Sequence, residues 1–185
     1  QFYGAVGIWC GLTAETLIKD NEIYDLPYTG ISVGWMWSPV PTPSRGNIIE
    51  GNHIHNIMQK LSDGGGIYML GFQPESKILN NRIHNVSLNA GRAESNGMFL
   101  DEGTTDVIVE GNLIYDIAKS PLRFHKATTN IVKDNYLFCG RNVPPIRYNN
   151  TNEDDIQKVG NKIFSEEDEN YNAELQKAKL AVSKK

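Results

Sequence analysis

Two acidic residues beside glycines are the residues of this sequence best suited to chemistry. Asp63 precedes three consecutive glycines, and Asp101 stands in a similar segment about one repeat later, followed by Glu102 and another glycine. Two carboxyl groups facing one substrate can act as a general acid and as a base or nucleophile. Asp before Gly is also a common turn residue, because its side chain binds local backbone N–H groups. For Asp63 both interpretations stay open, whereas Asp101, expected within a strand, favours catalysis.

Whether these carboxylates can meet depends on a repeated Asn-x-Ile motif. Copies begin at Asn21, Asn52, Asn81 and Asn112, with looser copies at Asn135 and Asn161, and they are 23 to 31 residues apart. Such a period indicates a solenoid or a propeller. The regular two-residue hairpin signals of a propeller are missing, and no segment between the copies has helical periodicity. The sequence therefore predicts an all-β, right-handed parallel β-helix of about five to six coils, each with three short strands.

Stacked coils place equivalent residues about 4.8 Å apart, so each position of the repeat becomes a column. We expect the Asn column to form an inward amide ladder and the following aliphatic column to be core. The next column should stack on the outside as an aromatic strip. In this strip we interpret the histidines as stacking residues rather than catalysts. The aliphatic column is Ile23, Ile54, Ile83, Ile114, Leu137 and Ile163, and the aromatic strip is Tyr24, His55, His84, Tyr115 and Phe138.

Another strand of each coil provides the face on which the acidic residues fall. It opens at Gly7, Gly30, Gly66, Gly97 and Pro121 in successive coils. Alternation then turns Tyr68, Phe99 and Arg123 outward, and two positions later Asp101 and His125 become neighbours about 5 Å apart. Arg123 has a structural alternative to substrate binding, which is to neutralise Asp101 across coils, and we expect Glu102 to support the turn. The predicted substrate-binding residues are Tyr68, Phe99, Glu102, Arg123 and His125.

Composition excludes several classes of function. With 18 basic and 22 acidic side chains and a net charge of −4, the chain lacks a nucleic-acid footprint. No apolar run approaches the roughly 18 residues that cross a bilayer. Metal ligands at recognisable spacing are missing, so we expect neither a metal nor a cofactor. Cys10 and Cys139 should lie roughly 19 Å apart along the stack, too far for a disulfide, and are expected to be free, buried thiols.

The ends of the chain suggest two units. We expect residues 1–164 to be the C-terminal part of a longer β-helix, because an open first coil exposes core and strand edges. A missing N-terminal β-helix segment or a capping partner would cover that coil. Residues 165–185 should be a helical cap or a flexible tail, with Ser165 as the helix N-cap before three acidic residues.

Several segments together resemble a known family. The segments Tyr24–Trp35, Asp63–Tyr68, Leu100–Gly103 and Arg123–His125 are similar to right-handed parallel β-helix repeat proteins of glycoside-hydrolase type, closest to glycoside hydrolase family 141. The resemblance covers roughly residues 4–140. It implies cleavage of complex plant polysaccharides, including α-fucosides and xylan, with Asp63 and Asp101 as the catalytic pair. We accordingly expect a polysaccharide or glycan partner and an extracellular or periplasmic location.

Two other functions stay open from the residues. A polysaccharide lyase would use His125 or Lys126 as the base and Arg123 to face a uronate. A non-catalytic binding or structural solenoid would use the aromatic strip as its working face. For a hydrolase, carboxyl groups about 5 Å apart predict retention of configuration, and a separation of roughly 6.5 to 9.5 Å predicts inversion.

Overall fold

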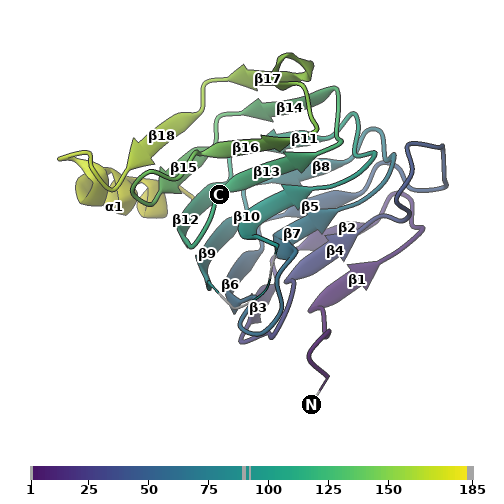
Figure 1. The fold of residues 1–185 in the computed structure, drawn as a ribbon, viewed down its shortest axis with the longest axis horizontal. Helices are drawn as coiled ribbons and strands as arrows, with labels where there is room; N and C mark the ends of the chain where they lie inside the picture. The colour runs from purple at the N-terminus through teal and green to yellow at the C-terminus, as the bar shows by residue number, and fades with distance from the viewer. Residues whose placement is uncertain (1, 89–90, 92, 183–185) are drawn as a thin grey trace.

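The structure is a computed structural model, and it describes residues 2–88, 91 and 93–182. The chain forms three parallel sheets, each with six strands in the described residues. The chain visits the sheets in turn, and each strand pairs in parallel with its counterpart one coil later (Figure 1). The predicted right-handed parallel β-helix is confirmed, with six coils.

The strands of each sheet stack in coil order. The first sheet holds β1 (Ile8–Cys10), β4 (Ile31–Val33), β7 (Gly64–Met69), β10 (Ser95–Leu100), β13 (Leu122–His125) and β16 (Ile146–Asn149). The second holds β2 (Leu17–Lys19), β5 (Ile48–Glu50), β8 (Lys77–Leu79), β11 (Ile108–Glu110), β14 (Asn130–Lys133) and β17 (Ile156–Val159). The third holds β3 (Glu22–Tyr24), β6 (His53–Ile57), β9 (Arg82–Val86), β12 (Leu113–Ile117), β15 (Tyr136–Cys139) and β18 (Lys162–Ser165). A short 3₁₀ helix, η1 (Glu153–Asp155), precedes β17, and α1 (Tyr171–Val182) follows β18.

The core is the stack of inward aliphatic side chains from all three sheets. Ile54, Ile83 and Ile114 pair in register and are fully buried, as the repeat predicts. Ile163 departs from the prediction, because only one side of the last coil is covered by another coil, and its side chain is 50% exposed. Column position therefore does not fix burial in the last coil, although Ile23 of the first coil is buried.

The asparagine ladder is also confirmed, and it satisfies backbone groups inside the turn between the second and third sheets. The Oδ1 atom of Asn112 accepts hydrogen bonds from the backbone N and Nδ2 of Asn81, at 2.8 and 3.0 Å. The Nδ2 atom of Asn112 then donates to Oδ1 of Asn135 at 2.9 Å. The same relation joins Asn21 to Asn52 and Asn135 to Asn161, so the ladder fixes the register of the coils.

A column of glycines, Gly7, Gly30, Gly66 and Gly97, lies along the first sheet because the coils approach closely there. A Cβ atom on Gly66 would lie 2.6 Å from Cγ2 of Ile83 and 2.8 Å from the carbonyl oxygen of Gly97. Neither neighbour can retreat from a buried stack. The glycine column therefore sets how tightly the first and third sheets pack.

The C-terminal helix exists, but it begins later than expected and covers a different surface. Ser165 is the last residue of β18 and not a helix N-cap, since its backbone N–H donates to Oδ2 of Asp168 at 2.7 Å within a turn. Leu175 and Ala178 of α1 pack on Tyr115 and Phe138, on the outer face of the third sheet. Figure 1 shows α1 beside β12 and β15 rather than across the end of the stack.

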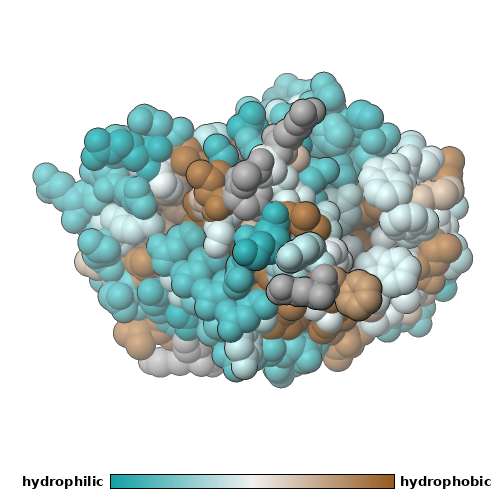
Figure 2. Space-filling model, turned by 60° about the horizontal axis from the view of Figure 1, so that its bottom comes forward, coloured by the Kyte–Doolittle hydropathy of each residue, from teal (hydrophilic) through white to brown (hydrophobic). Residues whose placement is uncertain are grey.

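Large apolar side chains that remain exposed are concentrated near the start of the chain. Figure 2 shows the lower side of the molecule, with hydrophilic surface on the left and pale or brown side chains gathered on the right. The exposed aromatic and aliphatic residues of this part of the chain are Phe2, Tyr3, Trp9, Leu12, Leu17, Tyr24, Trp35, Met36, Trp37 and Val40.

Candidate active site

The outward face of the first sheet brings the predicted residues into one row. Phe99 pairs in register with Tyr68 on one side and with Arg123 on the other. Met98 and Leu122, one residue earlier, are fully buried. The alternation inferred from the sequence is therefore correct for these coils.

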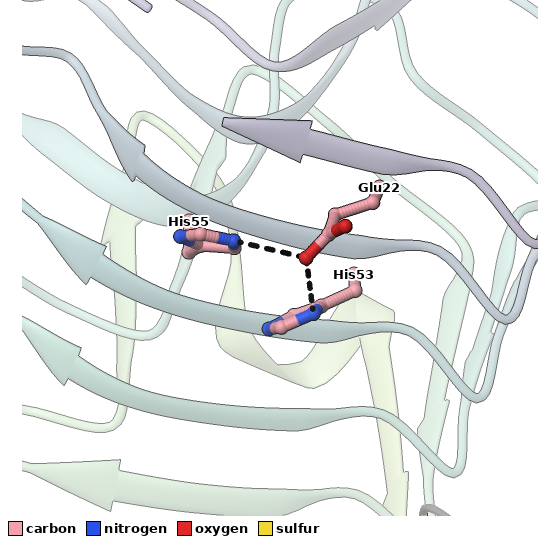
Figure 3. A group of neighbouring side chains, drawn as sticks. All are labelled: Glu22, His53 and His55. Carbon is pink, nitrogen blue, oxygen red and sulfur yellow. Dashed lines mark ion pairs between the residues drawn. The ribbon is translucent and has the colours of Figure 1, made fainter. Parts of the chain in front are cut away.

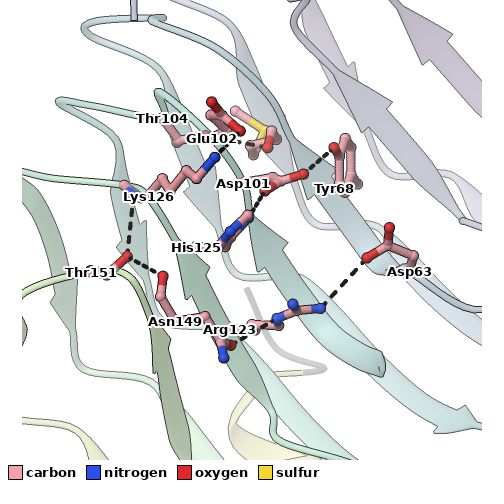
Figure 4. A network of polar contacts seen from close by, with 12 residues as sticks. Asp63, Tyr68, Asp101, Glu102, Thr104, Arg123, His125, Lys126, Asn149 and Thr151 are labelled. Atoms are coloured by element: carbon pink, nitrogen blue, oxygen red, sulfur yellow. Dashed lines mark hydrogen bonds and ion pairs between the residues drawn. The ribbon is translucent and has the colours of Figure 1, made fainter. Parts of the chain in front are cut away.

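Asp101 is the centre of the polar network on this face. It directly follows the last residue of β10, at the strand's end rather than within it, and it is buried. Its Oδ2 atom accepts a hydrogen bond of 2.5 Å from the Tyr68 hydroxyl, and its Oδ1 atom lies 2.7 Å from Nδ1 of His125 (Figure 4). An ionised carboxylate only accepts hydrogen bonds, so Nδ1 of His125 carries the proton and Nε2 is left as the acceptor of the neutral ring. The predicted Asp101–His125 contact is confirmed.

Tyr68 is held as a hydrogen-bond donor by its surroundings. Burial raises the pKa of its phenol well above the ordinary value, and the hydrogen bond to Asp101 and the negative charges nearby raise it further. The phenol therefore stays protonated throughout the ordinary pH range and keeps Asp101 oriented.

Arg123 pairs with a different carboxylate from the one expected. Its Nη1 atom lies 3.6 Å from Oδ1 of Asp63, and its Nε donates to Oδ1 of Asn149 at 3.1 Å. The alternative in which it neutralises Asp101 is wrong, because Arg123 turns to Asp63 while the Asp101 oxygens bind Tyr68 and His125. The buried Nη1 has no hydrogen-bond partner among the described residues. Its contact with Asp63 is therefore an ion pair without a hydrogen bond.

Asp63 occupies the turn before β7, as its glycines suggest. Its φ angle is 67°, in the left-handed region that Asp tolerates in turns. The Tyr28 hydroxyl donates to the Asp63 carbonyl oxygen at 2.9 Å, and the Asp63 side chain is 61% exposed. Figure 4 shows Asp63 and Asp101 on the same side of the first sheet, with Asp63 turned to Arg123 and Asp101 turned to Tyr68 and His125.

Phe99 and Glu102 take supporting positions. Phe99 was expected to offer its ring to a sugar, but the ring is 1% exposed because the Arg123 guanidinium lies 4.2 Å from its centroid. The ring instead supports Arg123 and packs edge-on against Tyr68 at 5.2 Å. Glu102 binds Lys126, with Oε2 2.9 Å from Nζ.

An aromatic hollow that the repeat does not predict lies beside this network. A cavity of about 210 Å³ is lined by three tryptophans and by Tyr68, whose hydroxyl binds Asp101. Trp9, Trp35 and Trp37 are 61%, 39% and 56% exposed. Two of them belong to the non-repeating segment between β4 and β5, where an exposed Trp-Met-Trp run was the available signal. The remaining lining residues are Val6, Tyr28, Thr29, Ser32 and Leu70.

The aromatic strip on the third sheet stacks as predicted but is partly covered. The rings of Tyr24 and His55, and of His84 and Tyr115, stack at centroid distances of 5.3 and 4.6 Å. Tyr115 and Phe138 are buried beneath α1. The open part of the strip is therefore confined to the first coils.

The sequence predicts no metal site, but one cluster brings three possible metal ligands together. Glu22, His53 and His55 place one ligand atom each within 4.8 Å of one another on the outside of the third sheet (Figure 3). The spacing escaped notice because Glu22 lies one coil before the two histidines.

The fold and its repeats define the class of protein. The chain belongs to the right-handed β-helix region family, whose model matches residues 6–169. A solved structure described as a glycoside hydrolase is similar, with a TM-score of 0.61, 25% identity, and coverage of 80% of this chain and 22% of that one. The chain thus spans about a fifth of that neighbour's length. No curated protein sequence matches the chain.

Between residues 2 and 182, apart from 89, 90 and 92, the structure has no helix long and apolar enough to cross a membrane.

Proposed function

We propose that this chain is part of a glycoside hydrolase, of the kind grouped in family 141, that acts on a complex polysaccharide through Asp63 and Asp101. The single observation that carries the proposal is the binding of both Asp101 oxygens by Tyr68 and His125 beside an aromatic hollow. The solved glycoside hydrolase of similar fold supports it. A secreted or periplasmic location fits such a substrate.

Asp101 takes the role of base or nucleophile. Two donors, at 2.5 and 2.7 Å, suit an ionised carboxylate and fix its orientation. A fixed carboxylate needs little reorganisation when charge develops at the sugar carbon. Its separation from the second carboxyl group in the substrate complex then sets retention or inversion.

Asp63 takes the role of general acid. Its side chain is exposed, so it can reach the oxygen of a glycosidic bond lying over the first sheet. In the free protein Nη1 of Arg123 lies 3.6 Å from Oδ1 of Asp63. A substrate carboxylate that draws Arg123 toward itself would release Asp63 to approach the leaving oxygen.

The aromatic hollow provides the sugar-binding surface. Indole rings cover the apolar faces of pyranose rings, and neighbouring polar groups hold the hydroxyls. Tyr68 joins the two functions, because its ring lines the hollow and its hydroxyl binds Asp101.

The test is hydrolysis by the variants Asp101→Asn and Asp63→Asn. On a panel of plant polysaccharides, assayed by release of reducing ends, both variants should lose activity while thermal unfolding stays nearly unchanged. Asp154→Asn is the matched control, since this exposed residue lies in η1, before β17 of the second sheet. Full activity of both site variants, or an inactive wild-type chain on every substrate, would refute the proposal.

A second candidate, a polysaccharide lyase, is favoured by one specific contact. The hydrogen bond from His125 to Asp101 leaves Nε2 as a base, whereas Lys126 is engaged by Glu102. Arg123, which pairs with Asp63 in the free protein, could turn to bind the uronate whose proton is removed. A lyase produces unsaturated products that absorb in the ultraviolet, and hydrolysis does not. Ultraviolet-absorbing products that disappear in His125→Gln would select the lyase.

A further inference from the structure

Three potential metal ligands meet on the outside of the third sheet, away from the face that carries Asp101. Glu22 on β3 pairs in register with His53 on β6, and His55 lies two residues further along the same strand. Residues two apart on a strand share a face. Nδ1 of His53 and Nε2 of His55 each lie 3.6 Å from the same atom, Oε1 of Glu22 (Figure 3).

A chain of hydrogen bonds fixes which nitrogen of His53 is free. Asn85 donates through Nδ2 to Oδ1 of Asn56 at 3.0 Å, so its Oδ1 is the atom that accepts from Nδ1 of His84, at 3.1 Å. His84 therefore offers Nε2 as an acceptor, and Nε2–H of His53 donates to it at 2.8 Å. The remaining nitrogen of His53, Nδ1, carries a lone pair that faces the Glu22 carboxylate.

Stacking fixes the second histidine. The His55 ring lies between the rings of Tyr24 and His84, with centroid distances of 5.3 and 5.0 Å and interplanar angles of 4° and 3°. Its side chain is 17% exposed. The ring therefore has little freedom to turn, and Nε2 stays directed at Glu22.

We propose that Glu22, His53 and His55 bind a divalent transition-metal ion, with zinc as the best match. Zinc holds imidazole nitrogen and carboxylate oxygen at about 2.0 to 2.2 Å, which puts two tetrahedral ligands roughly 3.3 to 3.6 Å apart. The observed separation of 3.6 Å for both nitrogen–oxygen pairs agrees with that geometry. Two histidines and one carboxylate leave a further position for water.

The surroundings support such a site. A histidine that binds a metal commonly donates its other ring N–H to a fixed acceptor, as His53 does to His84. Arg82, the register neighbour of His53 on the next coil, donates through Nη2 to the Tyr115 hydroxyl at 2.5 Å, so its side-chain hydrogen bond is made away from the three ligands. Glu22 is 63% exposed, so an ion can reach the site from solvent.

The test is calorimetric titration of the protein, free of any histidine tag, with zinc chloride near neutral pH. We expect one zinc ion per chain. Glu22→Gln, His53→Gln and His55→Gln should each weaken binding by at least about tenfold, since loss of even a supporting partner of a ligand costs 10–100-fold. The cobalt form should show the strong visible absorption of a four-coordinate ion.

The chain offers a matched control, because it has four histidines and one of them, His125, belongs to a different sheet. His125→Gln should bind zinc as the wild type does. Absence of saturable zinc binding in the wild type would overturn the proposal. Equal zinc affinity in the wild type and the three ligand variants, with all proteins folded by circular dichroism, would overturn it as well.

Discussion

Tyr68 and Asp101 stand on neighbouring coils, and the tyrosine hydroxyl donates a hydrogen bond of 2.5 Å to Oδ2 of the aspartate. The backbone N–H of Asp101 donates to the carbonyl oxygen of Met69, so the tyrosine reaches the carboxylate by leaning along the strand direction. Burial and the negative charge of Asp101 raise the pKa of the Tyr68 phenol, which keeps the donor in place. The contact thus depends on the register of β7 and β10.

Tyr68→Phe should lower kcat while changing KM little. The substitution removes one hydrogen bond to a charged group, worth about 1.5 to 3 kcal/mol, and this corresponds to roughly a 10- to 100-fold loss of rate if Asp101 needs that orientation. Steady-state hydrolysis of the best substrate measures both constants. Tyr24→Phe on the third sheet is the control. A kcat equal to that of the wild type would show that Asp101 does not depend on Tyr68.

Glycan binding should change the intrinsic tryptophan fluorescence. The chain has three tryptophans, and all of them line the hollow beside Tyr68. A sugar that covers these rings changes their exposure to water and therefore shifts their emission. Titration with oligosaccharides from the substrate measures the affinity, which should fall several-fold in Trp37→Ala. Tyr24→Ala removes an exposed ring elsewhere and should leave the affinity unchanged. Saturable binding without any change of emission would place the glycan outside the hollow.

Residues that follow the repeat could be placed from the sequence. In a parallel β-helix, two residues are neighbours when they hold the same position of the repeat in adjacent coils. The Asn-x-Ile copies were therefore enough to pair Ile54 with Ile83 and to place Asp101 beside His125. The position in the repeat does not predict where a long side chain points. The Arg123 side chain is long enough to approach either Asp63 or Asp101. It lies over the ring of Phe99 and pairs with Asp63.

The aromatic hollow and the cluster of three possible metal ligands could not be predicted from the repeat, because neither lies within a single column. The segment that carries Trp35 and Trp37 is an insertion between β4 and β5, where the repeat gives no frame. Glu22 and His53 form the outward column just before the aliphatic one, while His55 belongs to the column just after it. Both columns face the same side of the third sheet, and only their combination shows the ligand set.

Asn112→Ala should be strongly destabilising. The fully buried Asn112 side chain accepts from Asn81, and its Nδ2 donates to the carbonyl oxygens of Ile78 and Glu110 and to Oδ1 of Asn135. Removing it leaves several buried partners unpaired, each at a cost of about 1 to 3 kcal/mol, so we expect a loss of at least about 3 kcal/mol. Urea unfolding measures the loss.

An exposed asparagine provides the comparison for this ladder position. Asn142→Ala changes a solvent-exposed turn residue, and the cost of placing Ala at its positive φ limits the expected loss to about 1 to 2 kcal/mol. Similar losses of unfolding free energy in Asn112→Ala and Asn142→Ala would mean that a ladder asparagine stabilises the fold no more than an ordinary turn residue does.

Cys139 should be unreactive in the folded protein, and its burial should make stability depend on alkaline pH. Burial, with the charge of Asp168, raises the pKa of this thiol from 9.0 to about 12. Between these values the unfolded chain loses the proton that the folded chain keeps, so stability is complete below about pH 9 and falls as pH rises toward 12.

In Cys10→Ser, which leaves Cys139 as the remaining thiol, a disulfide reagent should react slowly with native protein and rapidly in urea. The half-buried Cys10, studied in Cys139→Ser, should react faster in the native state, because the thiolate is the attacking species and access to it is greater. Equal native rates in the two single-cysteine proteins would show that the β15 end of the stack opens as readily as the first coil.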